Sequence, residues 1–261
     1  MLKLSTWRTL ITASILLISG SVSAASSPPV IAAASDLQFA LTEIAEDFTR
    51  ESGQRVKLAF GSSGVFYRQI MQGGPFELYL SADETYVERL AANGMTQDTG
   101  TLYALGRLAL VIPDTAARNA DKQLGDMREG NIDSSIQRFA IANPEHAPYG
   151  QRAEEALRHI RLWDILKDRL VLGENVSQAA QFVASGNAQA GIVAYSLALA
   201  PALQEHTSMA LLPAAWHQPL RQRMVLTNKA GPVSEAFYHY MQTPAARAVM
   251  QRYGFDLNSG E

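Results

Sequence analysis

The stretch AAASDLQFAL, residues 32–41, indicates the fold class because two structural periodicities meet in it. Its three alanines are typical of a short buried strand, and the apolar residues that follow recur at the spacing of an amphipathic helix. The helical positions are Leu37, Leu41, Ile44 and Phe48. Ser35 and Asp36 therefore stand where a strand passes into a helix. Ligands of open α/β sheets gather at such junctions, beyond the strand and beside the positive end of the helix.

Short apolar runs alternate with helical periodicities along the rest of the chain, which predicts an α/β fold. Strands are expected in PVIAAA (29–34), VKLAF (56–60), ELYLSA (77–82), RLALVIP (107–113), RFAIAN (138–143), LVLGEN (170–175), GIVAYS (191–196), MALLP (209–213) and RQRMVLT (221–227). Helices are expected near 37–52, 64–73, 84–92, 150–161, 177–186, 232–242 and 244–253. The polar segment Asp114–Ser135 is interpreted as a surface connection within a second lobe.

The chain is also expected to divide into two lobes. Crossings near Arg107 and near His217–Leu220 would build the first lobe from both ends of the chain. The predicted first lobe comprises residues 25–107 and 219–261, and the second comprises residues 108–218.

The N-terminus has the features of a secretory signal peptide. Lys3 and Arg8 precede an apolar stretch from about Leu10 to Ile18, and small residues follow that allow cleavage after Ala24. A retained membrane anchor would need about 20 apolar residues, roughly twice the length of this stretch. We therefore predict that residues 1–24 are removed on export.

The composition narrows the class of protein further. The sequence contains no cysteine, which removes a disulfide framework and the thiol that a lipid anchor needs. The whole chain has a net charge of −3 and the signal peptide holds two of its cations, so the mature chain is at −5. A nucleic-acid partner is not expected for such a chain. We expect a soluble, monomeric periplasmic protein.

Two strand-to-helix junctions carry serines. Ser35 begins the pattern S-x-x-Q that ends at Gln38, which predicts a capping box at the start of the first helix. The second junction, FGSSG (60–64), places Ser62 and Ser63 between two glycines that permit a tight turn. Both junctions offer hydroxyl groups and free backbone N–H groups.

Two further junctions offer backbone donors. In NPEHAPYGQ (143–151), a helix begins near Gly150, so the N–H groups of Tyr149 and Gly150 are expected to lack helical partners, and His146 is interpreted as a surface histidine. In ENVSQA (174–179), Asn175 is a predicted N-cap and the Val176 N–H points out of the helix. These turns contain no lysine or arginine. They favour an anion held by neutral donors.

The chain resembles the molybdate-binding periplasmic proteins of ABC transporters. The resemblance is carried by AAASDL, FGSSG followed by RQI, PFELYLSADE, NPEHAPYGQRAEEAL, ENVSQA, GIV and the closing RYGF, in this order along nearly the whole mature chain. It implies a two-lobed type II binding fold with mixed sheets, which closes around molybdate or tungstate and delivers the anion to a membrane permease. It implies no cofactor and no catalytic residue.

The resemblance also implies a set of ligand-binding residues. Ser35 and Ser63 would offer hydroxyl and backbone donors, and Tyr149 and Val176 would offer backbone N–H groups from the other lobe. Ser62 is a possible additional contact.

Asp36 and Tyr195 are two further candidates that need a separate account. A carboxylate beside a bound dianion would repel it, so we expect the Asp36 side chain to turn away and cap the helix while its N–H faces the ligand. One branch of the family has a tyrosine directly after the GIV strand, where this chain has Ala194. Because a shift of one residue along a strand reverses the face, Tyr195 is a weak candidate.

Other functions fit the sequence less well. Sulfate or another tetrahedral oxyanion shares the charge and acceptor pattern of molybdate, and pocket size, which the motifs do not encode, would discriminate between them. A secreted serine hydrolase would need G-x-S-x-G, and GSSGV (61–65) lacks the second glycine. The five histidines show no metal-binding spacing.

Overall fold

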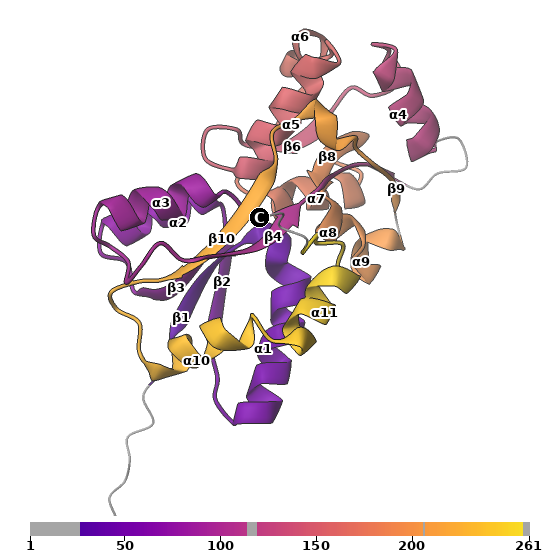
Figure 1. Cartoon of the computed structure of the whole chain (residues 1–261). Helices are drawn as coiled ribbons and strands as arrows, with labels where there is room; N and C mark the ends of the chain where they lie inside the picture. The colour runs from indigo at the N-terminus through magenta and orange to yellow at the C-terminus, as the bar shows by residue number, and fades with distance from the viewer. Residues whose placement is uncertain (1–26, 114–118, 206, 258–261) are drawn as a thin grey trace, which may run out of the picture.

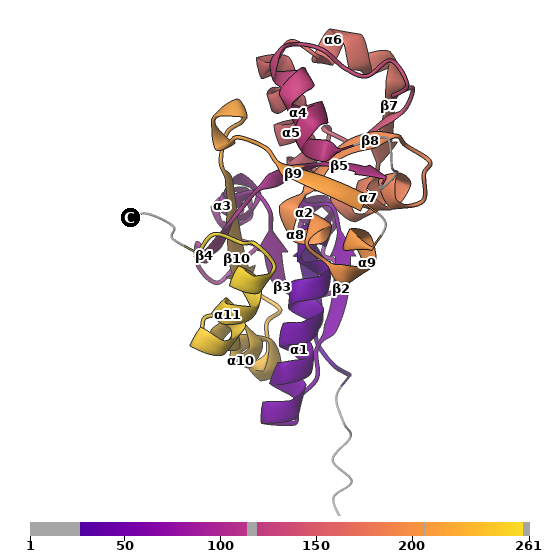
Figure 2. The same ribbon diagram turned by 90° about the vertical axis from the view of Figure 1, so that its right-hand side faces the viewer.

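Two five-stranded sheets form the protein, each flanked by helices (Figure 1, Figure 2). The computed structural model describes residues 27–113, 119–205 and 207–257. The first sheet has the strand order β2-β1-β3-β10-β4, and the second has the order β7-β6-β8-β5-β9. We call the part built on the first sheet lobe 1 and the part built on the second sheet lobe 2. The predicted two-lobed α/β architecture with mixed sheets is confirmed.

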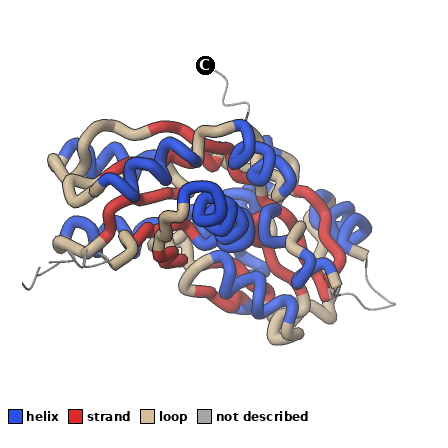
Figure 3. Tube along the Cα trace, turned by 90° about the horizontal axis from the view of Figure 1, so that it is seen from below, coloured by secondary structure: helices blue, strands red, loops and turns tan. Residues whose placement is uncertain are grey.

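Each lobe contributes five strands and several helices. Lobe 1 contains β1 (Val30–Ala34), α1 (Gln38–Ser52), β2 (Lys57–Gly61), α2 (Ser63–Met71), β3 (Phe76–Ser81), α3 (Glu84–Ala92), β4 (Thr101–Gly106), β10 (Leu220–Leu226), α10 (Pro232–Tyr240) and α11 (Pro244–Arg252). Lobe 2 contains β5 (Leu108–Pro113), α4 (Ala120–Arg128), β6 (Phe139–Ala142), α5 (Pro148–His159), α6 (Trp163–Leu166), β7 (Leu170–Gly173), α7 (Val176–Ala184), β8 (Ala190–Ala194), α8 (Tyr195–Ala198), α9 (Pro201–Gln204) and β9 (Thr207–Leu211). Figure 3 shows the strands running between the helices.

Strand β1 lies inside the first sheet and pairs in parallel with both β2 and β3. Its alanines are buried because helices cover both faces of the sheet at this point. Helix α1 then buries the apolar face that the sequence predicts, and Gly53 ends it in the left-handed conformation at a φ of 70°. The opening stretch therefore folds as expected from its two periodicities.

Both ends of the chain contribute to lobe 1. Figure 1 shows α1, in indigo, beside α10 and α11, in yellow. The Phe48 ring of α1 lies edge-on to Phe237 of α10, with centroids 5.1 Å apart, and also contacts Tyr240. The chain passes from the first sheet to the second at Arg107, between β4 and β5, and returns between β9 and β10.

Several expectations from the sequence need correction. Strand β4 was not predicted. Only Arg107 separates it from β5, so the sequence shows a single apolar run with no turn between two strands. The segment 114–135 contains helix α4. Its many polar residues obscure the helical spacing of the buried residues Ala120, Leu124 and Met127 in the sequence. The strand expected at 191–196 ends at Ala194, and α8 begins at Tyr195. The predicted signal peptide lies outside the described residues.

No helix in the part of the chain that the structure describes has the length and apolar character needed to cross a membrane. Nor do those residues contain a group of three or more His, Cys, Asp or Glu side chains that could hold a metal ion.

The packing of Phe48 generates a prediction about stability. Phe48 on α1 is buried against α10, so Phe48→Ala should lower the free energy of unfolding by about 3–5 kcal/mol, as is typical of a buried phenylalanine. Urea unfolding followed by circular dichroism measures this. Leu172→Ala, at a side chain that is 48% exposed, is the control and should change stability by less than about 1 kcal/mol. A comparable loss in both variants would contradict the assigned packing.

Candidate functional site

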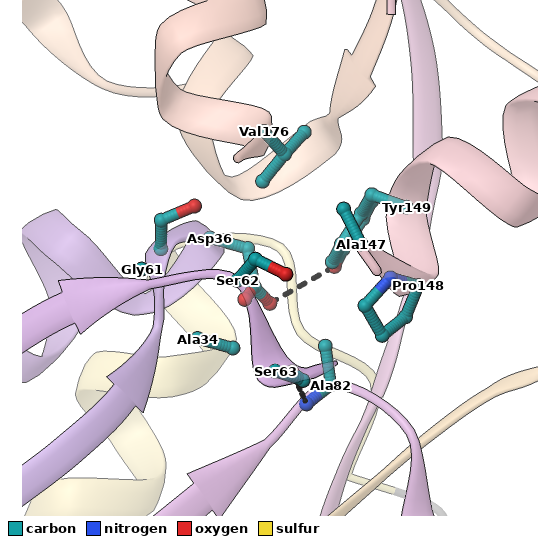
Figure 4. Close-up of a pocket in the computed structure, with 11 residues that line it drawn as sticks. Ala34, Asp36, Gly61, Ser62, Ser63, Ala82, Ala147, Pro148, Tyr149 and Val176 are labelled. Atoms are coloured by element: carbon teal, nitrogen blue, oxygen red, sulfur yellow. Dashed lines mark hydrogen bonds between the residues drawn. The ribbon is translucent and has the colours of Figure 1, made fainter. Parts of the chain in front are cut away.

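A small pocket lies between the two lobes, where several strands end. It is lined by Ala34, Ser35, Asp36, Gly61, Ser62, Ser63, Ala82, Ala147, Pro148, Tyr149 and Val176 (Figure 4). The space between these residues, counted together with the part open to solvent, is about 180 Å³. The four residues that the sequence analysis singled out as principal ligands, Ser35, Ser63, Tyr149 and Val176, all line this pocket.

Strand direction explains why these residues meet. Ser35 follows β1 and Ser63 follows β2, and these two strands are parallel, so their carboxyl ends lie at the same edge of the first sheet. Tyr149 and Val176 come after β6 and β7, which are parallel neighbours in the second sheet. The two edges face each other across the gap between the lobes. The pocket is thus formed by the ends of two parallel strand pairs.

Three helix starts supply backbone donors to the pocket. Ser63, Tyr149 and Val176 are in the first turns of α2, α5 and α7, where the helix itself leaves N–H groups unpaired. Among the described residues, none of these three N–H groups has a hydrogen-bond acceptor. Asn175 caps α7 by accepting from the Gln178 N–H, which confirms the predicted N-cap. The expectation for Gly150 is wrong, because its N–H donates to Ala147.

The pocket serines differ in what their hydroxyl groups can still do. The Ser63 Oγ accepts a hydrogen bond from the Ala82 N–H at 3.0 Å, and the Ser35 Oγ accepts one from the Ser177 N–H at 3.3 Å. Each of these hydroxyls therefore keeps its own hydrogen for a ligand. The Ser62 hydroxyl instead donates its hydrogen to the His146 carbonyl oxygen. Ser62 lines the pocket, but its hydroxyl hydrogen is already used in a hydrogen bond to lobe 2.

The capping box predicted from Ser35 to Gln38 is absent from this region of the described chain. A 3₁₀ turn covers Ser35–Leu37, and α1 begins only at Gln38, so Ser35 is not at the N-cap position. Both side chains reach across to lobe 2 instead. The Ser177 hydroxyl contacts the Ser35 carbonyl oxygen at 3.0 Å and Gln38 Oε1 at 2.8 Å. These polar groups therefore join the lobes.

Asp36 also differs from its expected conformation. Its side chain does not cap the helix but lies buried at the pocket, where the Tyr149 hydroxyl donates to Oδ2 at 3.0 Å (Figure 4). The Gln222 Nε2 donates to the same oxygen at 2.7 Å. These two donors, one from each lobe, fix the position of the carboxyl group. Burial raises the pKa of Asp36 to about 6, although hydrogen bonds from Gln222 and Tyr149 and the nearby amides of Asp36 and Leu37 oppose the shift.

His146 is buried and not a surface residue. Its Nδ1 lies 2.9 Å from the Ser62 Oγ, and its Nε2 lies 3.6 Å from a carboxylate oxygen of Glu174. The contacts run from Ser62 to His146 to Glu174, as in the catalytic triad of a hydrolase, but they lack the geometry of a triad. The Ser62 hydrogen points to the His146 carbonyl, so the imidazole is not placed to remove it.

The lobes are in close contact around the pocket. The Gly64 N–H donates to the His146 carbonyl oxygen at 2.9 Å, and a Cβ atom on Gly64 would lie only 2.6 Å from that oxygen. Nearby, Arg152 of lobe 2 forms an ion pair with Asp83 of lobe 1 at 3.1 Å, and both side chains are mostly buried. These contacts hold the structure in a closed arrangement.

Tyr195 lies away from the pocket. It is the first residue of α8, and its ring packs against Gly254 near the end of the chain. The face argument from the sequence assumed a strand at this position, but the strand has already ended.

Sequence reasoning missed Gln222 and Ser177. Gln222 is fully buried between Arg221 and Arg223 on β10, and the alternation of a strand could have placed it inward. Ser177 carried no such signal, because its role depends on the position of the opposite lobe.

Comparisons with known proteins agree with this architecture. Residues 29–256 match the family model described as bacterial extracellular solute-binding protein. The chain is 33% identical over 247 residues to the molybdate-binding protein ModA of Rhodobacter capsulatus, covering 94% of each chain. It is 34% identical to ModA of Azotobacter vinelandii, covering 87% of this chain and 89% of the relative.

A solved structure agrees as well. The periplasmic molybdate-binding protein of Azotobacter vinelandii superposes with a TM-score of 0.79 at 31% identity, covering 88% of this chain and 99% of that chain. The family match extends over both lobes and spans every residue that lines the pocket. The chain therefore belongs to the bacterial extracellular solute-binding protein family.

Proposed function

We propose that this protein is a periplasmic binding protein that captures molybdate, and also tungstate, between its lobes and delivers the anion to an ABC permease. The family is one of solute-binding proteins and not of enzymes. The relatives named as molybdate-binding proteins support the choice of anion. The lobes that close on it comprise residues 25–107 with 219–261, and residues 108–218.

The observation that carries the proposal is the set of unused neutral donors around one small pocket. The hydroxyl hydrogens of Ser35 and Ser63 and the N–H groups of Ser63, Tyr149 and Val176 are free for a ligand. They come from both lobes, so the closed state gains donors that an open state would lack. Of the described residues that line the pocket, none is a lysine, arginine or histidine. Uncharged groups would therefore hold the anion.

The energetic scale is sufficient for such binding. A hydrogen bond to a charged group contributes about 1.5–3 kcal/mol, and each helix terminus adds about 0.3–1 kcal/mol. Several of these together offset the loss of water from a small dianion. Closure also excludes water, which strengthens each bond.

The choice of anion is tested by titration calorimetry with molybdate, tungstate, sulfate and phosphate. We expect dissociation constants below about 1 μM for molybdate and tungstate. Sulfate and phosphate should bind at least about a hundredfold more weakly, because a pocket shaped for the larger molybdate tetrahedron would contact these smaller anions less completely. Tighter binding of sulfate would replace the proposed cargo with that oxyanion.

The two donor serines should each matter for affinity. Ser35→Ala and Ser63→Ala should each weaken molybdate binding by about 10- to 150-fold, the equivalent of about 1.5–3 kcal/mol for a lost charge-assisted bond. Calorimetry measures the effect. Ser234→Ala is the control, since Ser234 is equally buried in lobe 1 but remote from the pocket. Equal affinities for all four proteins would refute the assigned ligand contacts.

Closure itself can be tested at Gly64. The Gly64→Ala methyl group would press on the His146 carbonyl and keep the lobes apart, so molybdate affinity should fall by about 5- to 150-fold, as expected for 1–3 kcal/mol of overpacking. Gly125→Ala is the matched control, because a methyl group there meets no atom within 4 Å. If both variants bind like the wild type, the closed arrangement is not the binding state.

A further inference from the structure

Two of the residues that line the pocket have an ionisable side chain, the carboxyl group of Asp36 and the hydroxyl group of Tyr149. Asp36 is 1% exposed and lies where the proposed function requires a dianion. The inference drawn from it rests on that proposed function. An ionised carboxylate and a dianion enclosed together, with no cation beside them, would repel each other strongly.

The two carboxyl oxygens of Asp36 have different surroundings. Oδ2 accepts from the Tyr149 hydroxyl and from Gln222 Nε2. The orientation of Gln222 is fixed, because its Oε1 accepts from the Tyr103 hydroxyl at 2.7 Å. Oδ1 is buried as well; the amides of Asp36 and Leu37 lie near the carboxyl group, but no described group forms a hydrogen bond with Oδ1. A buried oxygen without a partner at a ligand pocket is costly unless a ligand supplies one.

The groups that face Asp36 are neutral on every side. Tyr149 on α5 and Tyr103 on β4 are titratable, and burial beside Asp36 raises the pKa of each well above its usual value, so both keep their hydrogens. Gln222 on β10 is an amide. Ser196 on α8 donates to the Asp36 carbonyl oxygen. No charged side chain contacts the carboxyl group from these elements, so a proton is the available means of removing its charge.

We propose that Asp36 is protonated when the pocket holds its oxyanion, and that Oδ1 donates this hydrogen to an oxygen of the ligand. Oδ2 keeps both of its present donors in this state. Asp36 thereby changes from a repelling group into a further neutral donor, like Ser35 and Ser63. Binding of a fully deprotonated dianion then takes up one proton from the solvent.

This coupling has a definite direction with pH. The pKa of the unliganded Asp36, about 6, means that the group is mostly ionised above about pH 7 and must gain a proton on binding. Affinity should therefore rise about tenfold for each unit that the pH falls between about 8.5 and 7, and should level off as the pH approaches 6. His146 is another ionisable side chain beside the pocket, through its contact with Ser62, and the variant below separates its contribution from that of Asp36.

The test is calorimetric titration with molybdate at about pH 8 in buffers of different ionisation enthalpy, which reports the protons taken up on binding. We expect the wild type to take up about one proton per molybdate. Asp36→Asn, which keeps a donor but cannot titrate, should take up none, and its affinity should not vary between about pH 7 and 8.5. Proton uptake that persists in Asp36→Asn would assign the proton elsewhere and overturn the proposal.

A second measurement needs no variant. Infrared difference spectra of the wild type should gain the carbonyl stretch of a protonated carboxyl group when molybdate is added at about pH 8. Binding of molybdate without proton uptake and without this band overturns the Asp36 proposal and leaves the proposed function standing. Absence of molybdate binding over the whole pH range overturns both.

Discussion

Unpaired N–H groups at helix starts are the constraint on which this structure depends. A helix cannot satisfy its first N–H groups, and a parallel strand delivers the chain directly to such a start. Here β1, β2, β6 and β7 all end at the gap between the lobes. The fold thus concentrates donors where no backbone acceptor competes for them. The serines at the same junctions add hydroxyl hydrogens of the same character.

The contacts between the lobes fix the shape of the pocket. Ser35, Ser62 and Gln38 of lobe 1 all bond with groups of lobe 2, and Gly64 allows the His146 carbonyl to approach its N–H. Each bond requires the lobes to be close together. The pocket is consequently complete only in the closed state, and its small volume suits a compact ligand. Closure and recognition are the same event in such a site.

The electrostatic character of the pocket comes from its own residues and not from the net charge of the chain. The net charge is negative, and the residues that line the pocket include no basic side chain. A neutral set of donors does not need a counter-ion when the pocket is empty, whereas a buried cation would. Asp36 is the exception, since it places an acid among these donors and shares it between Tyr149 and Gln222. A proton on this group would restore neutrality.

The sequence by itself determined the α/β class, most of the strands and helices, and the four junctions that line the pocket, because strand and helix periodicities and junction residues are local properties. It did not determine β4 or α4, whose patterns merge with a neighbouring strand or with a polar surface. Only the tertiary structure decided how Asp36, Ser35, Gln38 and His146 are used. Each of these residues has a partner on the opposite lobe, more than 80 residues away in the chain, and local patterns do not describe such contacts.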